Sequence, residues 1–211
     1  MDALILIDIQ NDFLPGGALA VPDGDQVIDV ANRVRAAFEM IAATQDWHPA
    51  NHGSFASNHP GGEVGELAEL DGLPQVLWPD HCIQQSLGAE FAAELDSSRW
   101  SRVVPKGCDV NVDSYSGFFD NGQRAATELH DFLQSIDVDA VFVMGLATDY
   151  CVKFTALDAV KLGYRTHLIL DGCRGVDLQP GDIERAVEEM RNAGVAITSS
   201  SELMERKENY R

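Results

Sequence analysis

Short apolar runs alternate with amphipathic segments along most of the chain, and this alternation restricts the fold more than any other feature. Runs rich in Ile and Val, typical of strands buried on both faces, occur at residues 3–7, 40–43, 103–104, 140–144, 166–170 and 195–198. Between most of them, apolar residues recur at helical spacing. Helices are therefore predicted at residues 27–38, 124–133, 149–162 and 182–193.

The order of these elements predicts an α/β fold. Strands that alternate with helices form a parallel sheet, because parallel neighbours need crossover connections. Right-handed crossovers then place helices on both faces of the sheet. No repeat, low-complexity tract or linker divides the 211 residues, so we predict a single domain over residues 1–211 in preference to two small ones.

The charge balance argues against nucleic acid or a membrane as a partner. The chain has 15 basic and 34 acidic residues, a formal net charge of −19. Binding to nucleic acid or to an anionic bilayer depends on Lys and Arg, so repulsion would dominate here. No apolar run approaches the roughly 20 residues that span a bilayer, and no basic segment precedes the first one. We expect a cytoplasmic protein with reduced cysteines.

One long segment, from residue 45 to about residue 87, interrupts the alternation. It has no clear long periodic element and is rich in Gly, Pro, His and Asp. Loops longer than about 15 residues in a compact domain are usually functional. This loop leaves the carboxyl end of the second predicted strand, at the edge of an open α/β sheet where ligands bind. We therefore expect it to carry part of a functional site.

Reactive side chains from distant parts of the sequence are predicted at the same edge. Asp8 ends the first strand, Lys106 follows the third and Cys151 follows the fourth. A typical cysteine is a buried small hydrophobe, but Thr148 and Asp149 favour a helix start that would place Cys151 where backbone N–H groups stabilise a thiolate. Asp8 and Lys106 could then supply a base and a balancing charge, with a structural ion pair as the alternative. The other cysteines are interpreted as structural: Cys82, Cys108 and Cys173.

The long loop also contains a candidate metal site. In extended backbone, Asp46 and His48 project to the same side, and His81 can approach from the far end of the loop. Three protein ligands leave positions open, as in catalytic divalent-metal sites. Solvated loop histidines are the alternative interpretation. His52 is a candidate fourth ligand, and we leave its role open.

Several ordered motifs together resemble the nicotinamidases of the isochorismatase-like cysteine hydrolase family. The resemblance runs from Ala3 to about Gly175. The matching blocks are LIDIQNDF (6–13), PGGALAV (15–21), DWHP (46–49), WPDHC (78–82), KG (106–107), DSYSGF (113–118) and GLATDYC (145–151). Residues 60–71 match no block and are either a lid or a variable loop.

The resemblance implies a Rossmann-like three-layer sandwich with a six-stranded, mainly parallel sheet. It also implies a full set of site residues. These are the catalytic triad Asp8, Lys106 and Cys151; the metal ligands Asp46, His48 and His81; the substrate-binding aromatics Phe13, Trp78 and Tyr115; and an oxyanion site formed by the backbone amides of Ala147 and Cys151. A cis peptide bond is expected between Leu146 and Ala147. The implied cofactor is one divalent metal ion, zinc in preference to iron or manganese.

The implied reaction is hydrolysis of nicotinamide to nicotinate and ammonia through a thioester, as part of NAD salvage. Pyrazinamide is a related carboxamide that such a site could accept. Two alternatives remain: an amidohydrolase of the same family that acts on a ureido or carbamoyl substrate, and a non-catalytic metal-binding domain. A small-molecule amide is the expected partner, and a homo-oligomer is left open.

Overall fold

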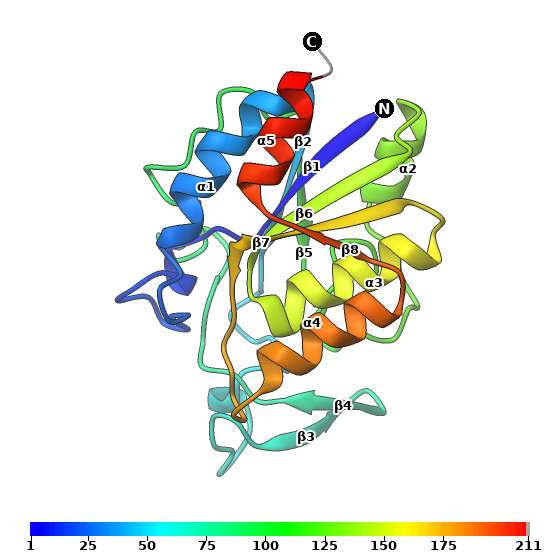
Figure 1. Cartoon of the computed structure of the whole chain (residues 1–211). Coiled ribbons are helices and arrows are strands. Elements are labelled where there is room, and N and C mark those ends of the chain that lie inside the picture. Colours follow the sequence, from blue (N-terminus) through cyan, green and yellow to red (C-terminus); the bar gives the residue numbers. More distant parts are fainter. Residues whose placement is uncertain (210–211) are drawn as a thin grey trace.

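A single six-stranded parallel sheet forms the centre of the computed structural model, which describes residues 1–209 (Figure 1). The strand order is β5-β2-β1-β6-β7-β8. The strands are β1 (Asp2–Ile7), β2 (Met40–Asp46), β5 (Arg102–Lys106), β6 (Ala140–Leu146), β7 (Arg165–Arg174) and β8 (Ala196–Thr198). Every adjacent pair in this sheet is parallel, so the predicted α/β fold is confirmed.

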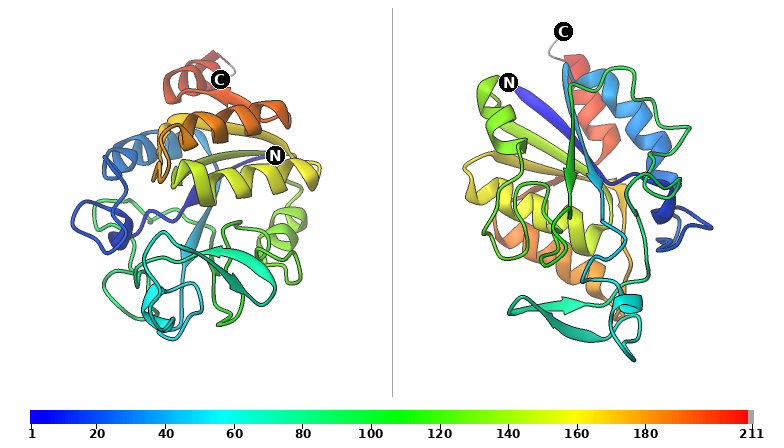
Figure 2. Two further views of the ribbon diagram at one scale, coloured as in Figure 1. Left: turned by 90° about the horizontal axis from the view of Figure 1, so that it is seen from below. Right: turned by 180° about the vertical axis from the view of Figure 1, so that it is seen from behind.

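Helices cover both faces of the sheet (Figures 1 and 2). On one face, α1 (Gln26–Val34) packs against β6, β7 and α5 (Ser200–Asn209). On the other face, α3 (Lys153–Lys161) packs against β6, β7 and α4 (Asp182–Asn192). The short helix α2 (Leu129–Ser135) precedes β6. Of the helices in the described part of the chain, none has the length and apolarity needed to cross a membrane.

The position of each strand in the sheet explains its sequence. The central strand β6 is buried along its whole length, which accounts for its continuous apolar run. The edge strand β5 differs, because Val103 is 36% exposed and the expectation of burial on both faces is wrong there. Pro105 lies in this strand, where the missing N–H group is tolerated at a sheet edge.

Several element boundaries differ from the sequence-based expectation. The predicted helix at residues 124–133 begins only at Leu129, because the Asp120 carboxylate accepts the backbone N–H groups of Arg124 and Ala125 and holds a turn there. The predicted helix at 149–162 begins as a π-helical turn over Thr148–Val152 before α3. The carboxyl-terminal helix α5 was not predicted.

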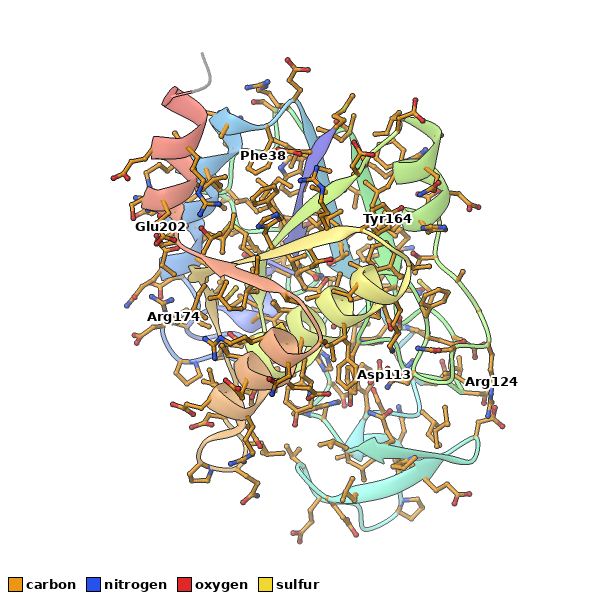
Figure 3. The ribbon with its side chains drawn as sticks, turned by 45° about the vertical axis from the view of Figure 1, so that its right-hand side comes forward. Phe38, Asp113, Arg124, Tyr164, Arg174 and Glu202 are labelled. Atoms are coloured by element: carbon orange, nitrogen blue, oxygen red, sulfur yellow. The ribbon has the colours of Figure 1, made fainter. Side chains whose placement is uncertain are left out.

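The long loop contains a small hairpin at residues 67–76, whose two strands have only four residues each, so the expectation that the loop has no long periodic element agrees with the structure. Its strands are β3 (Leu67–Leu70) and β4 (Leu73–Val76), which pair antiparallel. The hairpin lies beyond the carboxyl ends of the central strands (Figure 1). Arg124 reaches the hairpin turn and forms an ion pair with Asp71 (Figure 3).

Candidate active site

Asp8 is placed by the abrupt end of β1. The strand stops at Ile7, and Asp8 adopts a left-handed backbone conformation with φ of 46°. Its side chain is fully buried, and Thr44 Oγ1 donates a hydrogen bond to Asp8 Oδ1 at 2.6 Å. A non-glycine residue in this conformation costs about 1–3 kcal/mol and is typical of functional sites.

Lys106 connects the buried charges of the site. It is the last residue of β5, and its Nζ lies 2.9 Å from Asp8 Oδ2 and 3.3 Å from Cys151 Sγ. The same Nζ contacts Asp46 Oδ1 and donates to the carbonyl of Ser114 at 2.9 Å. Burial lowers the pKa of Lys106, but Asp46 and Asp8 together raise it well above its usual range. The side chain is therefore a fixed ammonium.

Cys151 lies in the π-helical turn that follows β6, with its thiol facing Lys106 and a carboxylate oxygen of Asp8 within 4.8 Å of its Sγ. Burial raises the pKa of the Cys151 thiol well above its usual range, and Lys106 opposes this only in part. The sequence-based expectation that Cys151 rests as a thiolate is therefore not supported, because the raised pKa favours the protonated thiol. A base must take the proton from the thiol.

Asp8 has the properties of that base. Burial raises the pKa of its carboxyl group, while the ammonium of Lys106 opposes the rise. Its Oδ2 is buried and has no hydrogen-bond donor among the described residues apart from the ion-pair contact with Lys106. A carboxylate with a free lone pair and a raised pKa is suited to accept and return a proton.

Three side chains converge on a candidate metal position. Asp46 Oδ2 lies 3.6 Å from His48 Nε2 and 3.7 Å from His81 Nε2. Both Nδ1 atoms lie 2.8 Å from backbone carbonyls, His48 from that of Gly107 and His81 from that of Pro79. Because a carbonyl only accepts, each Nδ1 carries the proton and each Nε2 offers its lone pair, as metal-ligating histidines do.

The charge and shape of this cluster also fit a divalent cation. Burial raises the pKa of Asp46, but the ammonium of Lys106 outweighs this effect and holds the pKa well below its usual range, so the carboxylate is ionised. Gly107 packs against the His48 ring: with φ of 65°, a Cβ atom there would lie 2.3 Å from His48 Cε1. Only glycine fits beside the imidazole, which fixes the orientation of the ring.

His52 lies beside this cluster and not within it. Its ring centroid is 4.4 Å from that of His48, and its Nδ1 is 2.7 Å from Ser54 Oγ. Its Nε2 is buried without a hydrogen-bond partner in the described part of the chain. The possible ligand atoms of His52 group with those of His48 and Asp113 instead of Asp46 and His81. A role as fourth ligand stays a prediction.

Cys151 and the three candidate metal ligands face one cavity at the carboxyl edge of the sheet. Cys151, Asp46, His48 and His81 line it. The aromatic residues implied by the resemblance also line it: Phe13, Trp78 and Tyr115. Trp78 Nε1 donates a hydrogen bond to the Tyr115 hydroxyl at 3.1 Å. The cavity therefore combines apolar, aromatic side chains with the polar side chains of Cys151 and the three candidate metal ligands.

Sequence reasoning missed four residues that line this cavity: Leu19, Asp113, Tyr150 and Val176. Tyr150 had a usable signal, because it precedes Cys151 directly, and its ring packs edge-on against Trp78 at 4.9 Å. The sequence contains no comparable signal for Val176, because this residue lies in an irregular segment after β7. Figure 3 shows Asp113 between the sheet and the β3–β4 hairpin.

The remaining sequence-based expectations concern the backbone and the other thiols. The peptide bond between Leu146 and Ala147 is cis, as predicted, and Ala147 lines the cavity. The roles of the Ala147 and Cys151 amides stay a prediction. Among the thiols interpreted as structural, Cys82 and Cys173 are buried, but Cys108 is exposed and that interpretation is wrong for it.

Comparisons with known proteins find relatives that match nearly the whole chain. The family model of the isochorismatase domain matches residues 2–202. The nicotinamidase of Escherichia coli strain K12 is 55% identical over 92% of this chain and 93% of its own length. A solved nicotinamidase and pyrazinamidase of Acinetobacter baumannii superposes with a TM-score of 0.93 at 45% identity, covering 96% of this chain and 97% of the other. The pyrazinamidase of Pyrococcus horikoshii, solved in complex with zinc, has a TM-score of 0.76 at 40% identity over 94% and 98% of the two chains.

Proposed function

Because the chain belongs to the isochorismatase family and is an amide-bond hydrolase of its nicotinamidase branch, we propose that it converts nicotinamide to nicotinate and ammonia in NAD salvage. One observation carries this proposal: the Cys151 thiol and the Asp46–His48–His81 cluster face the same aromatic-walled cavity. A planar ring with a carboxamide can therefore be held at one end and attacked at the other. The single-domain assignment and the cytoplasmic location stay predictions.

The first half of the reaction forms a thioester. Asp8 takes the proton of Cys151, and the sulfur attacks the carboxamide carbon of the substrate. The oxygen that becomes negative is stabilised by the backbone N–H groups of Ala147 and Cys151, where loss of one such donor typically costs about 10²–10³ in rate. Lys106 balances the charge that moves between sulfur and carboxylate. Protonated Asp8 then gives its proton to the departing nitrogen, and ammonia leaves.

The second half releases the acid. Asp8, again ionised, removes a proton from water, and the hydroxide attacks the thioester carbon. The carbon–sulfur bond breaks, the proton on Asp8 returns to the sulfur of Cys151, and the acid leaves and releases its proton to water as nicotinate. The carboxylate therefore acts as base, acid and base again, which agrees with its raised pKa.

The ring of the substrate is held by the candidate metal ligands and by the aromatic side chains of the cavity. We propose that Asp46, His48 and His81 hold one divalent ion, with zinc expected from the nitrogen-rich ligand set and the zinc-bound Pyrococcus relative. Such an ion supplies a Lewis acid for the pyridine nitrogen. Phe13 and Trp78 pack against the faces of the ring, and Tyr115 is held in place by its hydrogen bond from Trp78.

The activity test measures ammonia release from a panel of amides by the unaltered chain and by Cys151→Ala. We expect hydrolysis of nicotinamide and pyrazinamide, little of an N-carbamoyl amino acid, and a loss of at least about 10³-fold in the variant. The matched control is Cys108→Ala, whose exposed thiol lies outside the cavity and whose activity should be unchanged. A preference for the carbamoyl compound would overturn the substrate, and an active Cys151→Ala the nucleophile.

Removal of bound metal tests the other end of the site. Dialysis against a chelator should raise the dissociation constant of nicotinaldehyde or nicotinate, measured by calorimetry, because the ring nitrogen loses its anchor. Restoring zinc should reverse the change. Unchanged ligand affinity in the stripped protein would exclude anchoring through the metal while leaving the cysteine chemistry in place.

A further inference from the structure

Gln10 is a fully buried polar residue that the mechanism above does not use. It follows β1 by three residues and has no exposed surface. Its Oε1 accepts the backbone N–H of Asp46 at 2.8 Å, and its Nε2 donates to the backbone carbonyl of Asp46 at 2.8 Å. The same Nε2 donates to the carbonyl of Ala89 at 2.9 Å. The side-chain amide therefore satisfies both backbone groups of Asp46.

The hydrogen bonds of the Gln10 side chain take the place of β1–β2 strand pairing, which ends before Asp46. The pairing of β1 with β2 stops at Leu6 and Ala43, because the chain turns away at Asp8. On the opposite side, the Trp47 N–H donates to the carbonyl of Lys106 and continues the pairing with β5. The peptide groups of Asp46 face the side that β1 has left. Without the amide of Gln10, a buried N–H and a buried C=O would have no partner there.

We propose that Gln10 is a positioning residue that fixes the backbone of Asp46, and thereby aims its carboxylate at the divalent cation. This inference rests on the metal site of the proposed function. The Asp46 carboxylate must point one oxygen at Lys106 Nζ and the other between the two imidazoles. A small rotation of the Asp46 backbone would break both contacts together.

The chemistry of residue 10 is narrowly defined by its partners. One atom must accept from an N–H group and another must donate to two carbonyl oxygens, and a carboxamide is the side chain that does both. A methionine at this position has similar length and volume but neither function. An asparagine keeps the amide but is shorter by one methylene, so its amide cannot make the paired hydrogen bonds to the N–H and C=O groups of Asp46.

Gln45 offers a matched control from the same neighbourhood. Its Nε2 also donates to the carbonyl of Ala89, at 2.9 Å, but its side chain makes no hydrogen bond to the backbone of Asp46. Both Gln10→Met and Gln45→Met remove one donor from Ala89. Only Gln10→Met releases Asp46, so the difference between the variants reports on Asp46 alone.

The experiment measures the dissociation constants of Zn²⁺ and Co²⁺ for the full chain by competition with a chromophoric chelator. Loss of a residue that orients a metal ligand typically weakens metal affinity by about 10–100-fold, and we expect this for Gln10→Met. Gln45→Met should stay within about twofold of the unaltered chain. The visible absorption of the Co²⁺ form should change in Gln10→Met only. In the nicotinamidase assay, KM should rise more than kcat falls.

The outcomes separate the two proposals. If the unaltered chain binds metal and a folded Gln10→Met binds it equally well, or if Gln45→Met weakens binding as much, the role of Gln10 is overturned and the metal site stands. If the unaltered chain binds no metal, the metal site and this inference fall together, while ammonia release by Cys151 still tests the reaction. Should Gln10→Met not fold, Gln10→Asn must show the same loss of affinity, and an unchanged affinity would overturn the inference.

Discussion

At the scale of single residues, the site is organised around one buried cation. Lys106 contacts Asp8, Asp46 and Cys151, so its ammonium joins the proposed triad to the candidate metal cluster. A buried ion pair contributes little net stability by itself, but breaking one leaves an uncompensated charge. The two ends of the site are therefore electrostatically coupled through this side chain.

Replacement of Lys106 by methionine should destabilise the fold as well as abolish activity. The change leaves Asp8 and Asp46 buried without a balancing charge, and loss of one partner of a buried pair typically costs about 3–5 kcal/mol. Urea unfolding of metal-free protein measures the free energy, and ammonia release measures the activity. A variant as stable as the unaltered chain would show that the two carboxylates are not both ionised in the fold.

Strand ends were the signal by which the sequence identified Asp8, Lys106 and Cys151, because parallel strands finish at a common edge. The positions of Asp113 and Val176 could not be predicted in this way. Both lie in irregular segments whose paths depend on tertiary hydrogen bonds, such as that from Gln75 Nε2 to Asp113 Oδ2 at 3.0 Å. The spacing of apolar residues along the sequence carries no information about such tertiary hydrogen bonds.

At the scale of elements, the turn that carries Cys151 is joined to a distant loop. Asp149 was interpreted as a helix-starting residue, yet its carboxylate caps no helix end. Its two oxygens instead accept the N–H groups of Val176 at 2.9 Å and Asp177 at 2.8 Å. Helical spacing alone does not separate a π turn from an α turn, and it carries no information about a partner after β7.

Asp149→Ala should therefore loosen the loop that supplies Val176 to the cavity wall. Hydrogen bonds to a charged group contribute about 1.5–3 kcal/mol each, so we expect a loss of about 3 kcal/mol in unfolding free energy and a higher KM. Asp182→Ala is the control, because that carboxylate accepts the Gln179 N–H at 2.8 Å in the same loop but lies outside the cavity. If the KM of Asp149→Ala is the same as that of the unaltered chain, the hydrogen bonds of Asp149 do not shape the substrate site.

At the scale of the whole molecule, the formal net charge is −19, but the formal charges of the site nearly cancel. Asp8, Asp46 and Asp113 contribute three negative charges, whereas Lys106 and the proposed divalent ion would contribute three positive ones. The acidic surface therefore surrounds a centre of little net charge. Nicotinamide is neutral, so long-range steering by the surface should have little effect on its approach.

The second-order rate constant for nicotinamide should accordingly change by less than about twofold between low salt and about 0.5 M salt, where the Debye length falls to a few ångströms. Steady-state ammonia release over a salt series with a non-coordinating anion measures it. The product is an anion, so its inhibition constant serves as an internal comparison. A steep salt dependence for nicotinamide itself would contradict the view that global charge is irrelevant to substrate capture.

The strand order has a consequence for how the protein becomes active during its synthesis. Asp8 directly follows β1, and Asp46 and Lys106 are the last residues of β2 and β5, so all three are made early. Cys151 follows β6, which must insert between β1 and β7 to complete the sheet. Contacts between segments so distant in sequence form late, because loop closure must precede them. A chain that ends before β6 therefore lacks Cys151, and the proposed nucleophile meets its proposed base only after β6 has paired with β1.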